Sequence, residues 1–298
     1  MNVELHDGSR IDVVMEGEGP AILLPVNPVP VEGPQADEMR KWGADPALGR
    51  TLIAELSRKY RVIAFDYEGH VLQAPKPDTL TPENIAADFL RIADAAEAER
   101  FAYYGYSRLA LSGLQLAIRT DRLTALVMGG YPPIDGPYVE MLKVTNATHQ
   151  MSWSNASGNQ PSETAQAAEW GETSEEYDWS SVEVSMSEKQ TRQFVTLYEH
   201  LRGFDDRKAQ SLLTCPRLCF AGSKDRIEYG EKWGDVTVDI VSPLVSSQRR
   251  IDASGMGRAD FGWARSYGRD ASAACASGVA AMAGRPFIGG ITSHGCPG

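Results

Sequence analysis

Basic residues are scarce in this sequence, and the scarcity limits the partners that the protein can bind. Its 29 lysines and arginines are outnumbered by 40 aspartates and glutamates, so the formal net charge is -11. A chain this acidic disfavours a phosphate-binding surface. Nucleic acid is therefore not expected as a partner, whereas a small or neutral ligand is.

Long apolar runs are absent as well. No run approaches the roughly 18 residues of a membrane-spanning helix, and residues 1–7 contain no basic stretch followed by an apolar one. A cytoplasmic protein with no membrane partner is expected. The four cysteines have the spacing of neither a disulfide framework nor a zinc site, so they are interpreted as ordinary thiols.

Short apolar runs alternate with helical patterns through the first half of the chain. Continuous runs, typical of strands buried on both faces, occupy residues 21–25, 62–65, 101–104 and 125–128. Apolar residues at helical spacing lie between or after them, over residues 48–60, 81–96 and 108–118. This alternation predicts an α/β fold with a mostly parallel, doubly wound sheet. Before it, Asp7 and Gly8 predict a hairpin turn.

The pattern changes at residue 134, and the change predicts an insertion. Residues 134–212 hold three tryptophans among many polar residues, with one clear helical face around Phe194 and Leu201. Because a further apolar run at residues 216–221 resumes the sheet, the inserted segment is expected to form a helical cap. The core would then comprise residues 1–133 and 213–245.

A Gly-x-Ser turn joins the run at residues 101–104 to the following helix. A serine nucleophile needs a base, a group that orients the base, and N–H donors for the oxyanion. A sharp strand-to-helix turn holds the hydroxyl above the sheet and aims the next backbone N–H at the oxyanion. Ser107 is therefore the candidate nucleophile, and the N–H of Arg108 is one candidate donor.

Together these features resemble the α/β-hydrolase superfamily, of the esterase and peptidase-like type with a helical cap, over roughly residues 1–240. The resemblance implies that Asp225, after the strand at residues 216–221, is the catalytic acid. It implies that Val26 or Asn27 supplies the second oxyanion donor. The expected function is hydrolysis of a small ester, amide or related acyl substrate through an acyl-Ser107 intermediate, with no metal and no organic cofactor.

Two positions near the expected site depart from the pattern of that superfamily. Leu109 stands two residues after the nucleophile, where a small residue is usual, and Pro25-Val26 replaces a common His-Gly pair. Arg108 has two alternative interpretations. Its guanidinium either holds a substrate carboxylate or packs against acidic cap residues.

The histidine that would act as the base is missing from its expected place. It should follow Asp225 after the final strand, yet no histidine occurs between Asp225 and Thr292. His294 near the end of the chain and His70 in a core loop are the candidates to replace it. Without such a base the hydrolase would be impaired. The alternative is a non-catalytic module that binds a small ligand, with Ser107 as a hydrogen-bond donor.

Residues 246–298 differ in composition from the rest of the chain, because they contain no leucine, lysine or glutamate. An irregular, poorly ordered tail is expected there. One hypothesis is a reading-frame shift. Moving the frame by one base across the codons of residues 256–271 can give WDVRTLDGLDHTGAM, which reads as a strand followed by a Leu-Asp-His loop. The sequence gives neither the substrate nor the oligomeric state.

Overall fold

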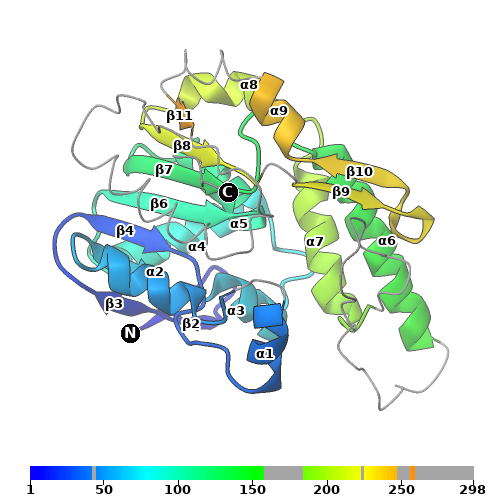
Figure 1. Ribbon diagram of the computed structural model, residues 1–298, viewed down its shortest axis with the longest axis horizontal. Helices are drawn as coiled ribbons and strands as arrows, with labels where there is room; N and C mark the ends of the chain where they lie inside the picture. Colours follow the sequence, from blue (N-terminus) through cyan, green and yellow to red (C-terminus); the bar gives the residue numbers. More distant parts are fainter. Residues whose placement is uncertain (42–44, 158–183, 223–224, 247–255, 259–298) are drawn as a thin grey trace, which may run out of the picture.

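The computed structural model describes residues 1–41, 45–157, 184–222, 225–246 and 256–258. A seven-stranded sheet with the order β11-β8-β7-β6-β4-β5-β3 forms its centre (Figure 1). Every neighbouring pair in this sheet is parallel except β3 and β5. The strands are β3 (Val14–Glu16), β4 (Ala21–Leu24), β5 (Arg61–Ala64), β6 (Phe101–Tyr106), β7 (Leu123–Gly129), β8 (Arg217–Phe220) and β11 (Met256–Arg258).

Helices cover both faces of this sheet, as the doubly wound prediction requires. In Figure 1 α2 lies in front of the sheet, and α4 and α5 lie behind it. The helices of the described residues are α1 (Pro34–Lys41), α2 (Leu48–Leu56), α3 (Tyr67–Gln73), α4 (Pro82–Ala95), α5 (Arg108–Ala117), α6 (Tyr138–Ser157), α7 (Glu188–His200), α8 (Asp206–Ala209) and α9 (Val241–Ser246).

Two apolar cores explain why the central strands are mostly apolar on both faces. In β4, Ile22 and Leu24 join the core that includes α2, whereas Leu23 joins the core of α4 and α5. Tyr103 and Tyr104 in β6 divide between the two cores in the same way. Successive side chains of a strand point to opposite faces, so a sheet covered on both faces has no polar side. The predicted α/β class and mostly parallel sheet are confirmed.

The hairpin turn and the start of α4 lie at the residues that the sequence predicts. Strands β1 (Asn2–Glu4) and β2 (Arg10–Asp12) pair antiparallel, and Gly8 in their turn has a φ of +80° that favours glycine. Thr81 caps α4 by accepting a hydrogen bond from the Asn84 N–H at 3.2 Å, and Pro82 follows as the first helical residue.

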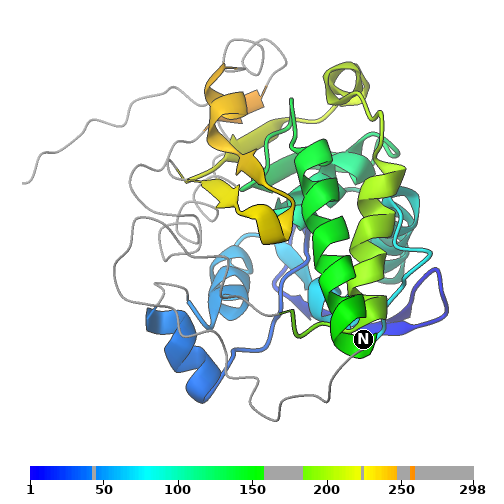
Figure 2. The same cartoon turned by 90° about the vertical axis from the view of Figure 1, so that its right-hand side faces the viewer.

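Helices α6 and α7, together with the hairpin of β9 (Arg226–Tyr229) and β10 (Val236–Asp239), lie beyond the carboxyl ends of the parallel strands (Figures 1 and 2). Both helices fall within residues 134–212. The sequence predicts α7 but not α6, because part of the buried face of α6 is polar. Ser152 is buried in the contact of the two helices, with its hydroxyl 2.7 Å from that of Thr191.

Strand β11 lies in the segment that the sequence predicts to be irregular. It pairs parallel with β8, with Met256 beside Arg217 and Arg258 beside Cys219. The sequence does not predict this strand, since three residues show no periodicity. The remaining residues of the tail, including His294, lie outside the described part of the chain.

Candidate active site

Ser107 is the single residue between strand β6 and helix α5. Its backbone has a φ of 53° and a ψ of −123°, a left-handed conformation that is strained for serine. The Ser107 N–H donates to the Gly129 carbonyl at 2.7 Å, which fixes the residue to β7. Its side chain does not cap α5 and is exposed. The turn therefore presents a hydroxyl at the carboxyl edge of the sheet.

Gly105 allows this turn because strand and helix approach closely there. A Cβ at Gly105 would lie 2.3 Å from the carbonyl oxygen of Leu109. The same carbonyl accepts a hydrogen bond from the Tyr103 hydroxyl at 2.7 Å. The Leu109 side chain is 7% exposed and packs in the core of α4 and α5. The core thus accommodates the large Leu109 side chain, which stands two residues after Ser107.

The two candidate oxyanion donors after β4 differ in their hydrogen bonding. Leu23 in β4 is paired with Tyr103 in β6, so Asn27 and Ser107 follow neighbouring strands at the same edge of the sheet. The Val26 N–H already donates to the Leu24 carbonyl at 2.8 Å. Among the described residues the N–H groups of Asn27 and Arg108 have no acceptor. Asn27 and Arg108 are therefore the donors that this geometry leaves available.

Asp225 lies at the same edge of the sheet, two strands away from Ser107. Tyr106, Gly129 and Phe220 are aligned across β6, β7 and β8, which puts the ends of β6 and β8 about 10 Å apart. Asp225 is half-buried, and its Oδ2 accepts a hydrogen bond from the Gly222 N–H at 2.9 Å. The Asp225 carboxylate therefore lies at the carboxyl edge of the sheet, the same edge at which a histidine following β11 would lie.

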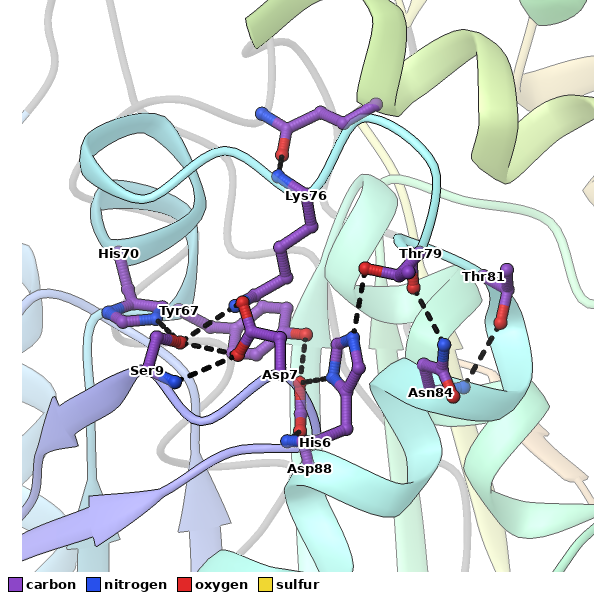
Figure 3. A network of polar contacts seen from close by, with 11 residues as sticks. His6, Asp7, Ser9, Tyr67, His70, Lys76, Thr79, Thr81, Asn84 and Asp88 are labelled. Carbon is purple, nitrogen blue, oxygen red and sulfur yellow. Dashed lines mark hydrogen bonds and ion pairs between the residues drawn. The ribbon is translucent and has the colours of Figure 1, made fainter. Parts of the chain in front are cut away.

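His70 is not directed toward the serine. Its Nε2 lies 2.9 Å from the Ser9 hydroxyl in the β1–β2 turn (Figure 3). Glu68, which pairs with Arg108 beside the nucleophile, precedes His70 by two residues on α3, and such residues point about 200° apart. Burial lowers the pKa of His70, and the charge of Lys76 lowers it further. His70 is thus a neutral ring engaged on another side of its helix.

The other described histidines also have partners away from Ser107, or are exposed. His6 Nδ1 is 2.8 Å from the buried Asp88 carboxylate, and His149 Nδ1 is 3.0 Å from the Thr191 hydroxyl. His200 is exposed at the end of α7. In the part of the chain that the structure describes, no histidine is therefore hydrogen-bonded to Ser107.

Arg108, the residue after Ser107, contacts both α3 and α7. Its guanidinium donates to Glu68 Oε1 at 3.0 Å and stacks on the ring of Phe194, with 3.9 Å between Cζ and the ring centroid. Glu68 belongs to α3 of the core, and Phe194 belongs to α7. The acidic partner is thus a core residue, and the contact with α7 is aromatic.

Polar contacts fix α7 to α3 and to the loop that follows it. The buried Gln193 side chain accepts from the Lys76 N–H and donates to the Val71 carbonyl, both at 3.0 Å. Gln190 donates to the Leu72 carbonyl at 2.7 Å. These bonds explain how a polar helix face is buried at little cost, because each backbone group gains a partner.

The sequence predicts neither a membrane-spanning helix nor a metal site, and the structure bears on both only in its described residues. Within these, no helix is long and apolar enough to cross a bilayer. Likewise, across the described ranges, His, Cys, Asp and Glu side chains form no group of three or more that could hold a metal ion. The absence of a metal or organic cofactor and the cytoplasmic location stay predictions.

The strand order, the strained serine after β6 and the helices at the carboxyl edge together define the α/β-hydrolase fold. No protein family model matches the chain, and no curated protein matches it. Among solved structures, a hydrolase from Pseudomonas aeruginosa PA01 is similar at 17% identity and a TM-score of 0.58, over 96% of this chain and 98% of that one.

Two further solved structures share this fold. An enol-lactonase from Burkholderia xenovorans LB400 is 17% identical, with a TM-score of 0.58 over 95% of this chain and 99% of that one. An esterase from Exiguobacterium antarcticum is 14% identical, with a TM-score of 0.56 over 94% and 97%. The chain therefore adopts the α/β-hydrolase fold, as predicted.

Proposed function

We propose that the protein is a serine hydrolase that acts on a small ester, amide or related acyl substrate through an acyl-Ser107 intermediate. The observation that carries this proposal is the strained backbone of Ser107, with φ at 53° and an exposed hydroxyl that does not cap its helix. Strain of this kind persists where the surrounding structure enforces it, often at reactive groups. The esterase and the enol-lactonase of the same fold support a small acyl substrate.

In the proposed reaction the Ser107 hydroxyl attacks the acyl carbon, and the charge on the carbonyl oxygen is stabilised by backbone N–H groups. Asn27 and Arg108 provide these groups, because their N–H bonds have no other acceptor among the described residues. The leaving alcohol or amine departs with a proton, and water then hydrolyses the acyl-enzyme. Asp225 orients the histidine that carries these protons in the complete mechanism.

The chain as written lacks that histidine, so we infer a strongly impaired enzyme. Loss of the histidine in such a triad lowers turnover by roughly 10⁶. A residual acceleration of about 10³ to 10⁴ over water remains from the oxyanion site and substrate binding. Weak but measurable chemistry at Ser107 is the expected behaviour.

The position of β11 supports the hypothesis of a reading-frame shift. Arg258, the last residue of β11, pairs with Cys219, so β11 ends at the carboxyl edge of the sheet, where Asp225 lies. The shifted segment begins at Met256, the first residue of β11, and carries its histidine in the loop that follows. Sequencing the gene tests this, and a stop codon soon after residue 245 in the shifted frame would contradict it.

Labelling with a fluorophosphonate probe tests the role of Ser107. We expect slow covalent labelling of the wild-type protein that disappears in Ser107→Ala. Ser211→Ala is the matched control, because Ser211 is an exposed serine far along the chain in another turn, and its loss should leave labelling unchanged. Intact-mass spectrometry measures the fraction labelled.

The second candidate is a non-catalytic module that binds a small ligand. It is favoured by the lack, among the described residues, of any histidine bonded to Ser107. No labelling of the wild-type protein, with ligand binding that survives Ser107→Ala, would support this module and would contradict the hydrolase proposal.

A further inference from the structure

The guanidinium of Arg108 is held in a fixed orientation, but only one of its amino groups pairs with an acceptor among the described residues. Its plane rests on the Phe194 ring at 3.9 Å, and one amino group pairs with Glu68 at 3.0 Å. Among the described residues, Nε and the second amino group have no acceptor, and the side chain remains 27% exposed. An arginine held on one face and one edge presents its remaining N–H groups in a fixed direction.

A second unused donor lies beside this guanidinium. Tyr198 is one helical turn after Phe194 on α7, so the two rings share a face of the helix. Its side chain is 3% exposed, yet its hydroxyl has no hydrogen bond with the described residues. Burial raises the pKa of Tyr198 to about 12, although the charge of nearby Arg108 lowers it. The phenol therefore stays protonated and can donate.

The backbone adds a third contribution at the same place. Helix α5 begins at Arg108, and the unpaired N–H groups of its first turn favour negative charge nearby. Guanidinium, phenol and helix terminus thus all favour an anionic oxygen next to the nucleophile. Glu68, with 45% of its side chain exposed, opposes such an anion, because its carboxylate offsets the charge of the guanidinium.

We propose that Arg108 and Tyr198 form a subsite for a carboxylate of the substrate, so the preferred acyl substrate carries a second, anionic carboxyl group. The remaining N–H groups of Arg108 accept a carboxylate in the paired geometry that guanidinium favours. Tyr198 donates a further hydrogen bond, and Glu68 sets the direction of the guanidinium. This inference rests on the proposed hydrolase, because it assigns a substrate class to the same site.

Direct binding of two matched ligands tests the subsite without requiring a reactive Ser107. The ligands are 4-phenylbutyrate and its neutral isostere 4-phenylbutyramide, titrated by NMR into the full-length protein. We expect wild-type protein to bind the carboxylate about 10- to 100-fold more tightly than the amide, as charged hydrogen bonds allow. Arg108→Met should abolish this preference, and Tyr198→Phe should reduce it.

Glu68→Gln gives the opposite expectation and keeps the test valid if Arg108→Met fails to fold. Removing this repelling charge should tighten carboxylate binding severalfold and leave amide binding unchanged. Arg192→Met is the control, because Arg192 lies on α7 but pairs with Glu199. Equal binding of both ligands to the wild-type protein, or binding of neither, overturns the inference. A preference that survives Arg108→Met also overturns it, since backbone N–H groups would then account for it.

Fluorophosphonate labelling of the same variants separates this inference from the proposed function. Labelling of Ser107 without a carboxylate preference overturns the subsite alone. A carboxylate preference without labelling overturns the acyl-Ser107 proposal and leaves the anion subsite in place.

Discussion

Tyr131 and Tyr67 both bury a phenol, but only Tyr67 uses its hydroxyl. The Tyr67 hydroxyl donates to the fully buried Asp88 carboxylate at 2.8 Å. The Tyr131 hydroxyl is buried with no hydrogen-bond partner among the described residues. A buried polar group without a partner loses its hydration and gains nothing in return.

We therefore expect Tyr131→Phe and Tyr67→Phe to change the free energy of unfolding by different amounts or in opposite directions. Tyr131→Phe should leave the free energy of unfolding unchanged or raise it by up to about 1 kcal/mol, because it removes an unpaired hydroxyl. Tyr67→Phe should lower it by about 1–3 kcal/mol, because Asp88 loses a donor. Urea denaturation measures both values, and an equal loss in the two variants would contradict this account.

At the scale of single residues, sequence was most informative where the backbone needs a particular side chain. Gly105 and Ser107 were predicted as a strand-to-helix turn, and the structure forms that turn. The hydrogen bond from the Val26 N–H to the Leu24 carbonyl could not be predicted, because it depends on how the chain turns after β4. The pairing of Arg108 with Glu68 was likewise unpredictable, since the two residues lie 40 positions apart.

Among the secondary-structure elements, α7 is held against α3 and the loop that follows α3. Its Gln193 occupies a fully buried position and bonds to the Val71 carbonyl of α3 and to the Lys76 N–H in the loop between α3 and α4. Loss of that side chain leaves the Lys76 N–H and the Val71 carbonyl buried without partners. The helix is therefore held by specific hydrogen bonds as well as by apolar contact.

Gln193→Ala is expected to lower the free energy of unfolding by about 2–4 kcal/mol, as two unsatisfied backbone groups and a cavity imply. The neighbouring Arg192→Ala removes only a surface pair with Glu199 and should cost less than about 1 kcal/mol. Urea denaturation gives both energies. The Lys76 amide should exchange hydrogen faster in Gln193→Ala but not in Arg192→Ala. Equal losses of unfolding free energy and equal exchange rates in the two variants would contradict this role of Gln193.

Strands and helices with strong periodicity were predicted well, and those without it were missed. The buried strands β4 to β8 were visible because two covered faces leave no polar alternation. Helix α6 was missed because buried Thr145 and Ser152 interrupt its apolar face. Strand β11 was missed because only its pairing with β8 identifies it.

At the scale of the whole molecule, a polar network joins the hairpin, α3 and the loop before α4 (Figure 3). The buried Lys76 ammonium pairs with Asp7 and donates to Ser9 at 2.8 Å, and Ser9 contacts His70. Burial alone would raise the pKa of Asp7, but hydrogen bonds from Lys76 and Ser9 and the charge of Lys76 lower it well below its usual value.

The network makes stability depend on pH through His70. Its folded pKa lies below the unfolded value of 6.5, so the unfolded chain binds the proton more readily. The contribution of His70 is present above pH 6.5 and is lost progressively as the pH falls from 6.5 through the lower pKa of the folded state. Stability of the wild-type protein should therefore fall between pH 7.5 and 5.5, as urea denaturation at each pH would show.

His70→Gln should show a smaller fall over the same range, because glutamine keeps an N–H donor for Ser9 and does not titrate. His200→Gln, at an exposed position on α7, should retain the wild-type slope. If the wild-type protein and His70→Gln lost stability in parallel, His70 would not be the group responsible.

The sequence by itself determined the fold class, the turn at Ser107 and the succession of core strands along the chain, because these follow from local periodicity and backbone requirements. It also showed that no histidine lies between Asp225 and Thr292, since a count of residues needs no coordinates. Only the tertiary structure decided which N–H groups remain available beside Ser107, that His70 points elsewhere, and that Arg108 meets Phe194. Those results depend on side chains from distant segments, whose meeting is set by strand order and packing.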